Sequence, residues 1–326
     1  MDTLTLGTRG SQLALFQAHA VAGRLRERDG VECEIVVIKT SGDRLSEASL
    51  AEIGGKRLFV KEIEDALLDG TVDLAVHSSK DMPALLPAGL TIGAVLPRED
   101  ARDAVVLPLL ADGGGEFLAL DDVVRRLGRA PRIGTSSIRR IAQLTRMFPG
   151  ARFLPIRGNL DTRLRKVDAG EFDAIVLAAA GLRRLQHESR ISAALPPDTC
   201  VPAPGQGIIA VEIRSDDAQT RERVARITDP AAAAALSAER ALVTRLGGGC
   251  QMPIGAFASE IGNELRMIAI VVSIDGSRAA RAETRGPIAD AERVGIDAAE
   301  QLLARGAADI LADVEQAHGA VEGIQP

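Results

Sequence analysis

Leu4-Thr5-Leu6-Gly7-Thr8-Arg9-Gly10-Ser11 combines a short apolar strand, a Gly-Thr turn and a hydroxyl that precedes a helix-forming run. The same order recurs in Pro131-Arg132-Ile133-Gly134-Thr135-Ser136-Ser137, which leads into a second helix. Downstream, Gly70-Thr71-Val72-Asp73-Leu74 parallels Gly170-Glu171-Phe172-Asp173-Ala174, each a helix-ending glycine that runs into a buried strand. This repeat predicts two α/β domains with sheets of the parallel type, the alternative being that Gly-Thr recurs by chance.

Alternation of apolar residues and turn signals predict the remaining elements. We expect further strands at 31–39, 90–96, 103–107 and 207–213, the last returning the chain to the first domain. A helix at 231–245, antiparallel strands at 254–258, 265–273 and 278–285 and an amphipathic helix at 289–305 predict a smaller α+β module. The expected domains are 1–100 with 199–216, then 101–198, then 217–318, followed by a disordered tail at 319–326.

Two polar segments stand out between these elements. Pro97-Arg98-Glu99-Asp100 separates two predicted strands and is expected to act as a hinge between the first two domains. The stretch 41–56 is long and has no apolar period. Such stretches in compact domains are commonly lids, so we interpret it as a cover over a cleft, with a plain disordered insertion as the alternative.

Composition narrows the class of protein. The 326 residues are 46% hydrophobic and 26% charged, and they include no Trp, no Tyr and only seven Phe, so Leu, Ile, Val and Ala must build the core. A net charge of −6 argues against nucleic acid and anionic membranes as partners. Three widely spaced cysteines give neither a disulfide framework nor a metal site. Without a signal peptide or a long apolar run, the sequence predicts a cytoplasmic protein.

Cations and hydroxyls gather where the repeat places ligand-facing ends. Ligands of such sheets bind beyond the carboxyl ends of the strands, at helix N-termini. The candidate residues are Arg9, Ser11, Thr135, Ser136, Ser137, Arg139, Arg140, Arg157, Gly158, Arg163, Arg183 and Arg184. Guanidinium groups bind phosphates and carboxylates in a bidentate manner, so the cluster predicts a ligand with several anionic groups. Phosphates and carboxylates both fit, although no Walker-type lysine loop is present.

The segment Ala75-Val76-His77-Ser78-Ser79-Lys80-Asp81-Met82-Pro83 closes the first copy of the repeat. A buried strand here leads into a loop with a hydroxyl, a cation and a carboxylate. Asp81 is a candidate for proton transfer or for stabilising a developing cation, with Lys80 beside it to hold an anion or to tune its pKa. The alternative is an ordinary aspartate in a turn, and His77 is expected to be structural.

Cys250 follows three glycines in Leu246-Gly247-Gly248-Gly249-Cys250-Gln251. Glycines remove the side chains that would shield the thiol and allow backbone to approach a ligand closely. This pattern is typical of an attachment point or a nucleophile. The alternative is a small apolar residue packed after a helix end.

Taken together, these motifs resemble the porphobilinogen deaminase (hydroxymethylbilane synthase) family over nearly the whole chain. The resemblance rests on Gly7-Thr8-Arg9, Gly54-Gly55-Lys56, Val76-His77-Ser78-Ser79-Lys80-Asp81, Gly134-Thr135-Ser136-Ser137-Ile138-Arg139-Arg140, Arg157-Gly158-Asn159, Pro204-Gly205-Gln206-Gly207 and Gly248-Gly249-Cys250-Gln251. It implies two α/β domains like those of periplasmic binding proteins, with a cleft between them, plus a smaller C-terminal α+β domain. It also implies a monomer.

The resemblance further implies an activity in tetrapyrrole biosynthesis. The family condenses four porphobilinogen molecules head to tail with loss of ammonia and releases hydroxymethylbilane. A dipyrromethane cofactor, attached through a thioether to the residue that matches Cys250, primes the chain. Asp81, assisted by Lys80, matches the catalytic position. Because each substrate carries an acetate and a propionate, the carboxylates would be held by Arg9, Ser11, Ser78, Lys80, Thr135, Ser136, Ser137, Arg139, Arg140, Arg157, Gly158, Arg163 and Arg184.

Two other classes of protein share some of these features. Solute-binding proteins also have two lobes around a ligand, but that class usually needs a secretion signal and has no use for the glycine-flanked cysteine. A cysteine-nucleophile transferase of another kind would need a base paired with Cys250, and the four histidines show no evident pairing.

Overall fold

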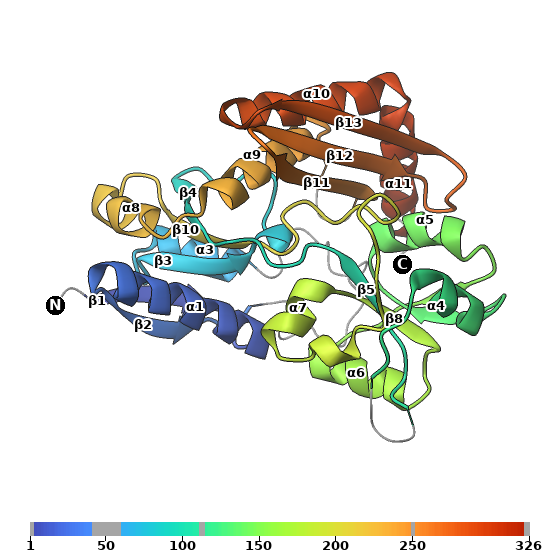
Figure 1. Cartoon of the computed structure of the whole chain (residues 1–326). Helices are drawn as coiled ribbons and strands as arrows, with labels where there is room; N and C mark the ends of the chain where they lie inside the picture. Colours follow the sequence, from blue (N-terminus) through green and yellow to red (C-terminus); the bar gives the residue numbers. More distant parts are fainter. Residues whose placement is uncertain (1–2, 41–59, 111–114, 249–251, 323–326) are drawn as a thin grey trace.

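The computed structural model describes residues 3–40, 60–110, 115–248 and 252–322. Two five-stranded sheets with their helices form two lobes, and a three-stranded sheet backed by helices lies above them in the view of Figure 1. The predicted lid at 41–56 and Cys250 lie outside the described residues.

The first sheet has the order β2-β1-β3-β10-β4. Its strands are β1 (Thr3–Thr8), β2 (Glu32–Val37), β3 (Leu74–Ser78), β4 (Leu90–Val95) and β10 (Ile209–Arg214). Helices α1 (Gln12–Asp29) and α3 (Lys61–Leu68) accompany it, and η1 (Ser79–Asp81) follows β3 directly. Separate apolar clusters cover its two faces, one built around Val21 and Leu25 of α1 and the other around Ile63 and Leu67 of α3.

The second sheet repeats this arrangement in the order β7-β6-β8-β5-β9. Its strands are β5 (Asp103–Val106), β6 (Arg132–Gly134), β7 (Arg152–Leu154), β8 (Ala174–Ala178) and β9 (Ala193–Ala194). The helices are α4 (Leu120–Leu127), α5 (Ile138–Met147), α6 (Leu160–Asp168), α7 (Ala179–Arg184) and the short η2 (Glu188–Arg190). The two orders correspond strand by strand, so the repeat seen in the sequence is a repeat of the fold.

Both sheets are mixed, which corrects the expectation of parallel sheets. β1 runs parallel to β2 and β3, and β6 runs parallel to β7 and β8. In contrast, β10 is antiparallel to β3 and β4, and β5 is antiparallel to β8 and β9. β5 and β10 arrive directly from the other lobe. They do not follow a helical crossover within their own sheet, which is the connection that makes neighbouring strands parallel.

The two passages between the lobes are hydrogen-bonded to each other. The first joins β4 to β5 and includes the predicted hinge at 97–100, and the second joins β9 to β10. Glu99 N donates to the carbonyl of Gly207 over 3.0 Å, and the Gln206 side chain donates to the carbonyl of Ala101 over 2.7 Å. The two crossings therefore form one paired connection.

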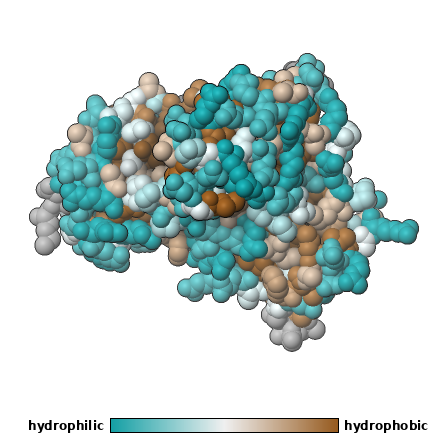
Figure 2. All heavy atoms as spheres, turned by 45° about the horizontal axis from the view of Figure 1, so that its top comes forward, coloured by the Kyte–Doolittle hydropathy of each residue, from teal (hydrophilic) through white to brown (hydrophobic). Residues whose placement is uncertain are grey.

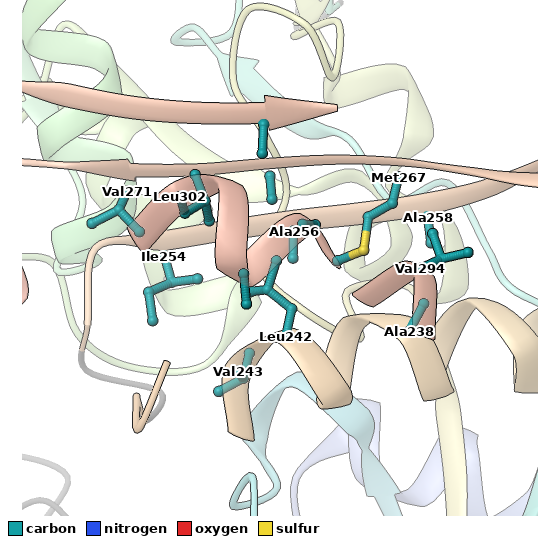
Figure 3. Packing of buried hydrophobic residues seen from close by; sticks show 14 of the residues in the cluster. Ala238, Leu242, Val243, Ile254, Ala256, Ala258, Met267, Val271, Val294 and Leu302 are labelled. Atoms are coloured by element: carbon teal, nitrogen blue, oxygen red, sulfur yellow. The ribbon is translucent and has the colours of Figure 1, made fainter. Parts of the chain in front are cut away.

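The C-terminal module packs a sheet against helices. Its elements are α9 (Pro230–Arg245), β11 (Ile254–Ile261), β12 (Glu264–Val272), β13 (Ala279–Pro287), η3 (Ile288–Asp290), α10 (Ala291–Ala304) and α11 (Ala307–Glu322). The preceding helix α8 (Ala218–Ala225) instead packs on the first sheet, where Val224 joins the apolar cluster of Val21 and Leu25. Leu242 and Val243 of α9 lie near Ile254 and Ala256 of β11 in one apolar cluster (Figure 3). The helix α11 continues past Gly319, where the sequence predicts a disordered tail.

Buried Glu239 fastens this module to the two crossings. Its carboxylate accepts from Arg98 Nη1 over 2.6 Å and from the backbone N–H groups of Gly205 and Ala258 over 2.6 and 2.8 Å. The Arg98 guanidinium also lies 4.8 Å from the centre of the Phe257 ring. A fully buried carboxylate with these partners fixes α9 and β11 on the hinge region.

The outer surface is dominated by hydrophilic residues on the face shown in Figure 2, interrupted by hydrophobic patches. Leu85 and Phe117 are the most exposed of the large apolar side chains of the described residues. No helix in the described ranges is long and apolar enough to cross a membrane.

Candidate active site

The loop at the end of β3 presents Asp81 and Lys80 in opposite environments. Asp81 is exposed, and its carboxylate makes no hydrogen bond or ion pair with any described residue. Lys80 likewise has no such partner in the described ranges, and burial lowers the pKa of its ammonium group to about 8, although Asp81 acts in the opposite direction. A carboxylate open to a ligand therefore follows directly after a desolvated cation.

His77 lies on β3, four residues before Asp81, and its buried side chain packs within the sheet. Its Nε2 lies 2.9 Å from Oε2 of Glu212, and both side chains are almost completely enclosed. β10, which carries Glu212, is the neighbour of β3, so the pair bridges adjacent strands. The structural role expected for His77 agrees with this position.

The helix that follows the first Gly-Thr turn is hydrogen-bonded to the end of β3. Ser11 caps α1 by accepting from Ala14 N over 3.3 Å, and Ser78 accepts from Gln17 Nε2 over 2.7 Å. Gln17 is buried in the second turn of α1, so this bond joins α1 to the end of β3. Arg9 lies in the Gly-Thr turn and is half-buried.

The second Gly-Thr turn uses its hydroxyls mainly for its own backbone. Ser136 Oγ donates to the carbonyl of Ile156 over 3.0 Å and accepts from Ile156 N over 3.1 Å, which joins the turn to the end of β7. Thr135 accepts from Ser137 N over 3.2 Å, and Ser137 caps α5. Ser137 also lines a cavity described below.

Arg139 and Arg140, at the start of α5, share the carboxylate of Asp103. Arg139 Nη1 donates to Asp103 Oδ2 over 2.7 Å, and Arg140 Nη2 and Nε donate to Oδ1 over 2.8 and 3.0 Å. Burial alone would raise the pKa of Asp103, but the two guanidinium groups hold it well below its usual range. All three side chains are buried, and Asp103 is the first residue of β5, so the pair is fixed to the hinge.

Arg139 and Arg140 differ in how their remaining N–H donors are used. Arg140 also donates from Nη1 to the carbonyl of Val176 over 2.9 Å, so each of its nitrogens has a protein partner. Arg139 uses only Nη1, which also reaches the carbonyl of Val201 over 2.8 Å. Among the described residues its Nε and Nη2 have no partner, and Arg139 lines the cavity. Of the two, Arg139 is the one that offers free donors.

Arg163 and Arg157 are further cations of the second lobe. Arg163 Nε donates to the carbonyl of Gly158 over 2.9 Å, and Gly158 has a positive φ of 103° in the turn before α6. Burial, followed by the charge of Arg140, lowers the pKa of Arg163 to about 10, while Asp81 opposes the shift and Arg157 adds to it. Asp81, from the first lobe, is therefore within electrostatic reach of Arg163 in the second.

Arg184 crosses from α7 to the opposite lobe. Its Nη2 donates to the carbonyl of Gly207 over 2.7 Å, and burial lowers the pKa of the group to about 10 against the opposing charge of Glu99. The neighbouring Arg183 is more exposed and lies 3.5 and 3.6 Å from Glu99 and Asp100. Arg184 is thus the inward member of this pair.

A cavity of about 80 Å³ lies where the three parts of the chain meet. Lys80 and Ser79 reach it from the first lobe, Ser137 and Arg139 from the second, and Arg240 from α9. Leu236, Val243 and Ile254 form an apolar wall, and Met252, the first described residue after 249–251, also lines the cavity. The cavity can hold a group that is apolar on one side and anionic on the other.

Sequence reasoning found the cations but missed their organisers. The sequence patterns did not predict the residues that hold the site elements in place, which are Asp103, Gln17 and Glu239. Asp103 did leave a signal, because it is an acidic residue at the start of an apolar strand, where a carboxylate needs a partner. Among the described residues, no group of three or more His, Cys, Asp or Glu side chains is arranged to hold a metal ion.

Comparison with known proteins identifies the family. The family described as porphobilinogen deaminase, dipyromethane cofactor binding domain, matches residues 4–222, and the porphobilinogen deaminase C-terminal domain matches residues 233–304. The chain belongs to the porphobilinogen deaminase family. A porphobilinogen deaminase from Geotalea daltonii is 44% identical over 97% of this chain and 96% of its own length. One from Geobacter metallireducens is 45% identical over 96% of this chain and 95% of its own length.

Among solved structures, the periplasmic VFT2 domain of Bordetella pertussis BvgS is similar, with a TM-score of 0.37 and 19% identity over 69% of this chain and 85% of that one. The family assignment rests on the sequence matches. Together with the sheet topology it confirms the expected fold class of two α/β lobes and a smaller C-terminal module.

Proposed function

We propose that this protein is a hydroxymethylbilane synthase of the transferase class. It would join four porphobilinogen molecules head to tail, release one ammonia with each, and finally release the linear tetrapyrrole by hydrolysis. The observation that supports this most directly is the open carboxylate of Asp81, which faces no protein partner in the described ranges while Arg163 of the other lobe lies within electrostatic reach.

The cationic surroundings fit the dipyrromethane that the family domain binds. Dipyrromethane is made from two porphobilinogen units, so it carries acetate and propionate groups on apolar rings. Lys80 and the free edge of Arg139 offer donors to carboxylates, and the apolar wall of Leu236, Val243 and Ile254 suits a pyrrole ring. When bound, the cofactor supplies the pyrrole carbon on which the chain grows.

Asp81 is suited to stabilise the positive charge that develops on the substrate. When porphobilinogen loses ammonia, the charge spreads to the pyrrole nitrogen, and a carboxylate held near the pyrrole N–H lowers the energy of that state. The same carboxylate can accept the proton that the attacked ring carbon loses, and the carboxyl group so formed can pass that proton to a departing amine. Its exposure leaves it accessible to successive substrates.

The attachment of the cofactor to Cys250 is part of the proposal. The other two cysteines are poorly suited to form a thioether, because the thiolate is the reactive form. Burial, followed by the charges of Glu32 and Asp73, raises the pKa of Cys33 to about 11, and burial beside Asp103 raises that of Cys200 to about 12. The glycine-flanked Cys250 is left as the candidate.

The intact mass of the denatured protein tests the assignment. We expect an excess over the sequence mass equal to two linked pyrrole units, lost in Cys250→Ala and retained in Cys33→Ala. The purified protein should also consume porphobilinogen and release ammonia. A fully active protein without added mass would contradict the proposal. A monomeric state and a cytoplasmic location stay predictions.

A further inference from the structure

Arg240 of α9 lines the cavity, yet it belongs to neither α/β lobe. Its Nη2 donates to the carbonyl of Ala84 over 2.7 Å, which is its one hydrogen bond to the described residues. A guanidinium group has five N–H donors, so most of them remain available. No carboxylate of the described ranges pairs with it.

The charge of Arg240 is poorly compensated. Burial lowers the pKa of this group, and Glu212, which acts in the opposite direction, is itself bound to His77. Lys80, on the same cavity, also lacks an ion-pair partner in the described ranges. Both side chains are half-buried, and a partly desolvated cation without an ion-pair partner favours a site that is completed by an anionic ligand.

The position of Arg240 defines what that ligand can be. The apolar side chains Leu236 and Val243 lie on the same helix and line the same cavity, so a flat apolar group would rest against α9 with an anionic substituent at Arg240. A cavity of about 80 Å³ is several times what one water needs. A carboxylate on a short chain fits this combination better than a bare inorganic ion.

We propose that Arg240 binds a carboxylate of the dipyrromethane cofactor, so that the cofactor is held by the C-terminal module as well as by both lobes. This inference rests on the proposed function. It adds a ligand-binding residue outside the set predicted from the sequence, all of whose cations lie at 9–184. The competing role is a simple latch, in which Arg240 only docks α9 on the carbonyl of Ala84.

A comparison of protein with and without the bound cofactor distinguishes the ligand-binding role from the latch. The unloaded protein is the full chain with Cys250→Ala, and the loaded protein is the full chain as purified. If Arg240 binds the cofactor, Arg240→Gln should lower the thermal midpoint of the loaded protein and leave that of the unloaded protein unchanged or higher, because an uncompensated charge is removed. A latch predicts that both midpoints fall equally, and that outcome overturns the proposal.

Cofactor assembly gives a second readout. A full-length protein that keeps Cys250 but carries no added mass can be incubated with porphobilinogen. Intact mass should then show that Arg240→Gln gains the added mass at least about tenfold more slowly than the wild type, since a charge-assisted hydrogen bond is lost. Arg245→Gln is the matched control, because Arg245 lies on the same helix and pairs with Glu300 at the surface. Assembly at the wild-type rate in Arg240→Gln refutes the role.

Two further substitutions keep the inference testable if Arg240→Gln does not fold. If Arg240→Gln does not accumulate as folded protein, Arg240→Lys keeps a cation and should assemble the cofactor faster than Arg240→Leu; equal rates for these two overturn the inference. A wild-type protein that never carries added mass would instead refute the proposed function itself, and the inference with it.

Discussion

Replacing Asp103 by asparagine tests whether one buried carboxylate supports the arginine pair. In the wild type Asp103 is fully buried and accepts from Arg139 over 2.7 Å, from Arg140 over 2.8 and 3.0 Å, and from Gln206 over 2.9 Å. Asp103→Asn keeps the size of the side chain but removes the charge. Two buried guanidinium groups would then face an amide that can offer only one acceptor atom.

The cost should be large because the pair is buried. Removing one partner of a buried ion pair typically destabilises a protein by about 3–5 kcal/mol, since the remaining charge is left uncompensated. At about 2–4 °C per kcal/mol for a domain of moderate size, the thermal midpoint should fall by at least about 6 °C. Asp122→Asn is the control, because its partner Arg125 is exposed and such pairs contribute at most about 1 kcal/mol.

Thermal unfolding of both variants, followed by circular dichroism at neutral pH, checks this expectation. The pH dependence of the thermal midpoint tests the sign of the Asp103 contribution independently. The native pKa of Asp103 is depressed, so its contribution to stability is complete above the unfolded value of about 3.9 and is lost as the pH falls below it. The difference between wild type and Asp103→Asn should therefore narrow in acid. A midpoint as close to the wild type as that of Asp122→Asn would show that the reasoning is wrong.

Three further predictions concern the site. Asp81→Asn should keep the added mass but reduce turnover by about 10²–10⁴-fold, measured as porphobilinogen consumption, and near-normal turnover would remove Asp81 from the mechanism. Cofactor assembly by protein that keeps Cys250 but carries no added mass should slow as the pH rises through about 8, because Lys80 loses its charge there, and Lys80→Arg should abolish this decline; a decline that persists in Lys80→Arg would rule out Lys80 as its source. Gly158→Ala should cost at least about 1 kcal/mol in urea unfolding, since φ is 103° and the new Cβ would lie 2.6 Å from Thr162; unchanged stability would mean that the turn relaxes freely.

Local patterns were sufficient to predict most of the elements. The strands at 254–258, 265–273 and 278–285 are observed as β11, β12 and β13, and the helix at 231–245 as α9. These segments carry their own periodicity and end at turn residues, so neighbouring sequence determines them. The Gly-Thr repeat also predicted the correspondence between the two lobes.

The direction of β5 and β10 could not be predicted in the same way. Both are short apolar runs, and nothing within either run states which way its neighbours point. Their direction follows from the path of the chain, which enters the second lobe as β5 and returns to the first lobe as β10. Topology therefore overrode the expectation that a strand–helix repeat makes parallel sheets.

The candidate site was predicted residue by residue but not as a network. A sequence shows that Arg139 and Arg140 are adjacent. It does not show that every nitrogen of the Arg140 guanidinium bonds to Asp103 or Val176, while two nitrogens of Arg139 have no partner among the described residues. The sequence did not predict a role for Arg240, because Arg240 lies on α9 in the C-terminal module and the anion-binding pattern was confined to the two lobes.

The balance of charge around the cavity explains why these parts are assembled together. In the described ranges, Lys80, Arg139, Arg140 and Arg240 lie on or beside the cavity, while Asp103 is the one carboxylate that bonds directly to any of them. Such an excess of cations is unfavourable until anions arrive, so a ligand that carries several carboxylates would bind and stabilise the three-part junction at once. Placing the primer at this junction would make it a structural component of the protein, and its loss should then loosen the contact between the lobes and the C-terminal module.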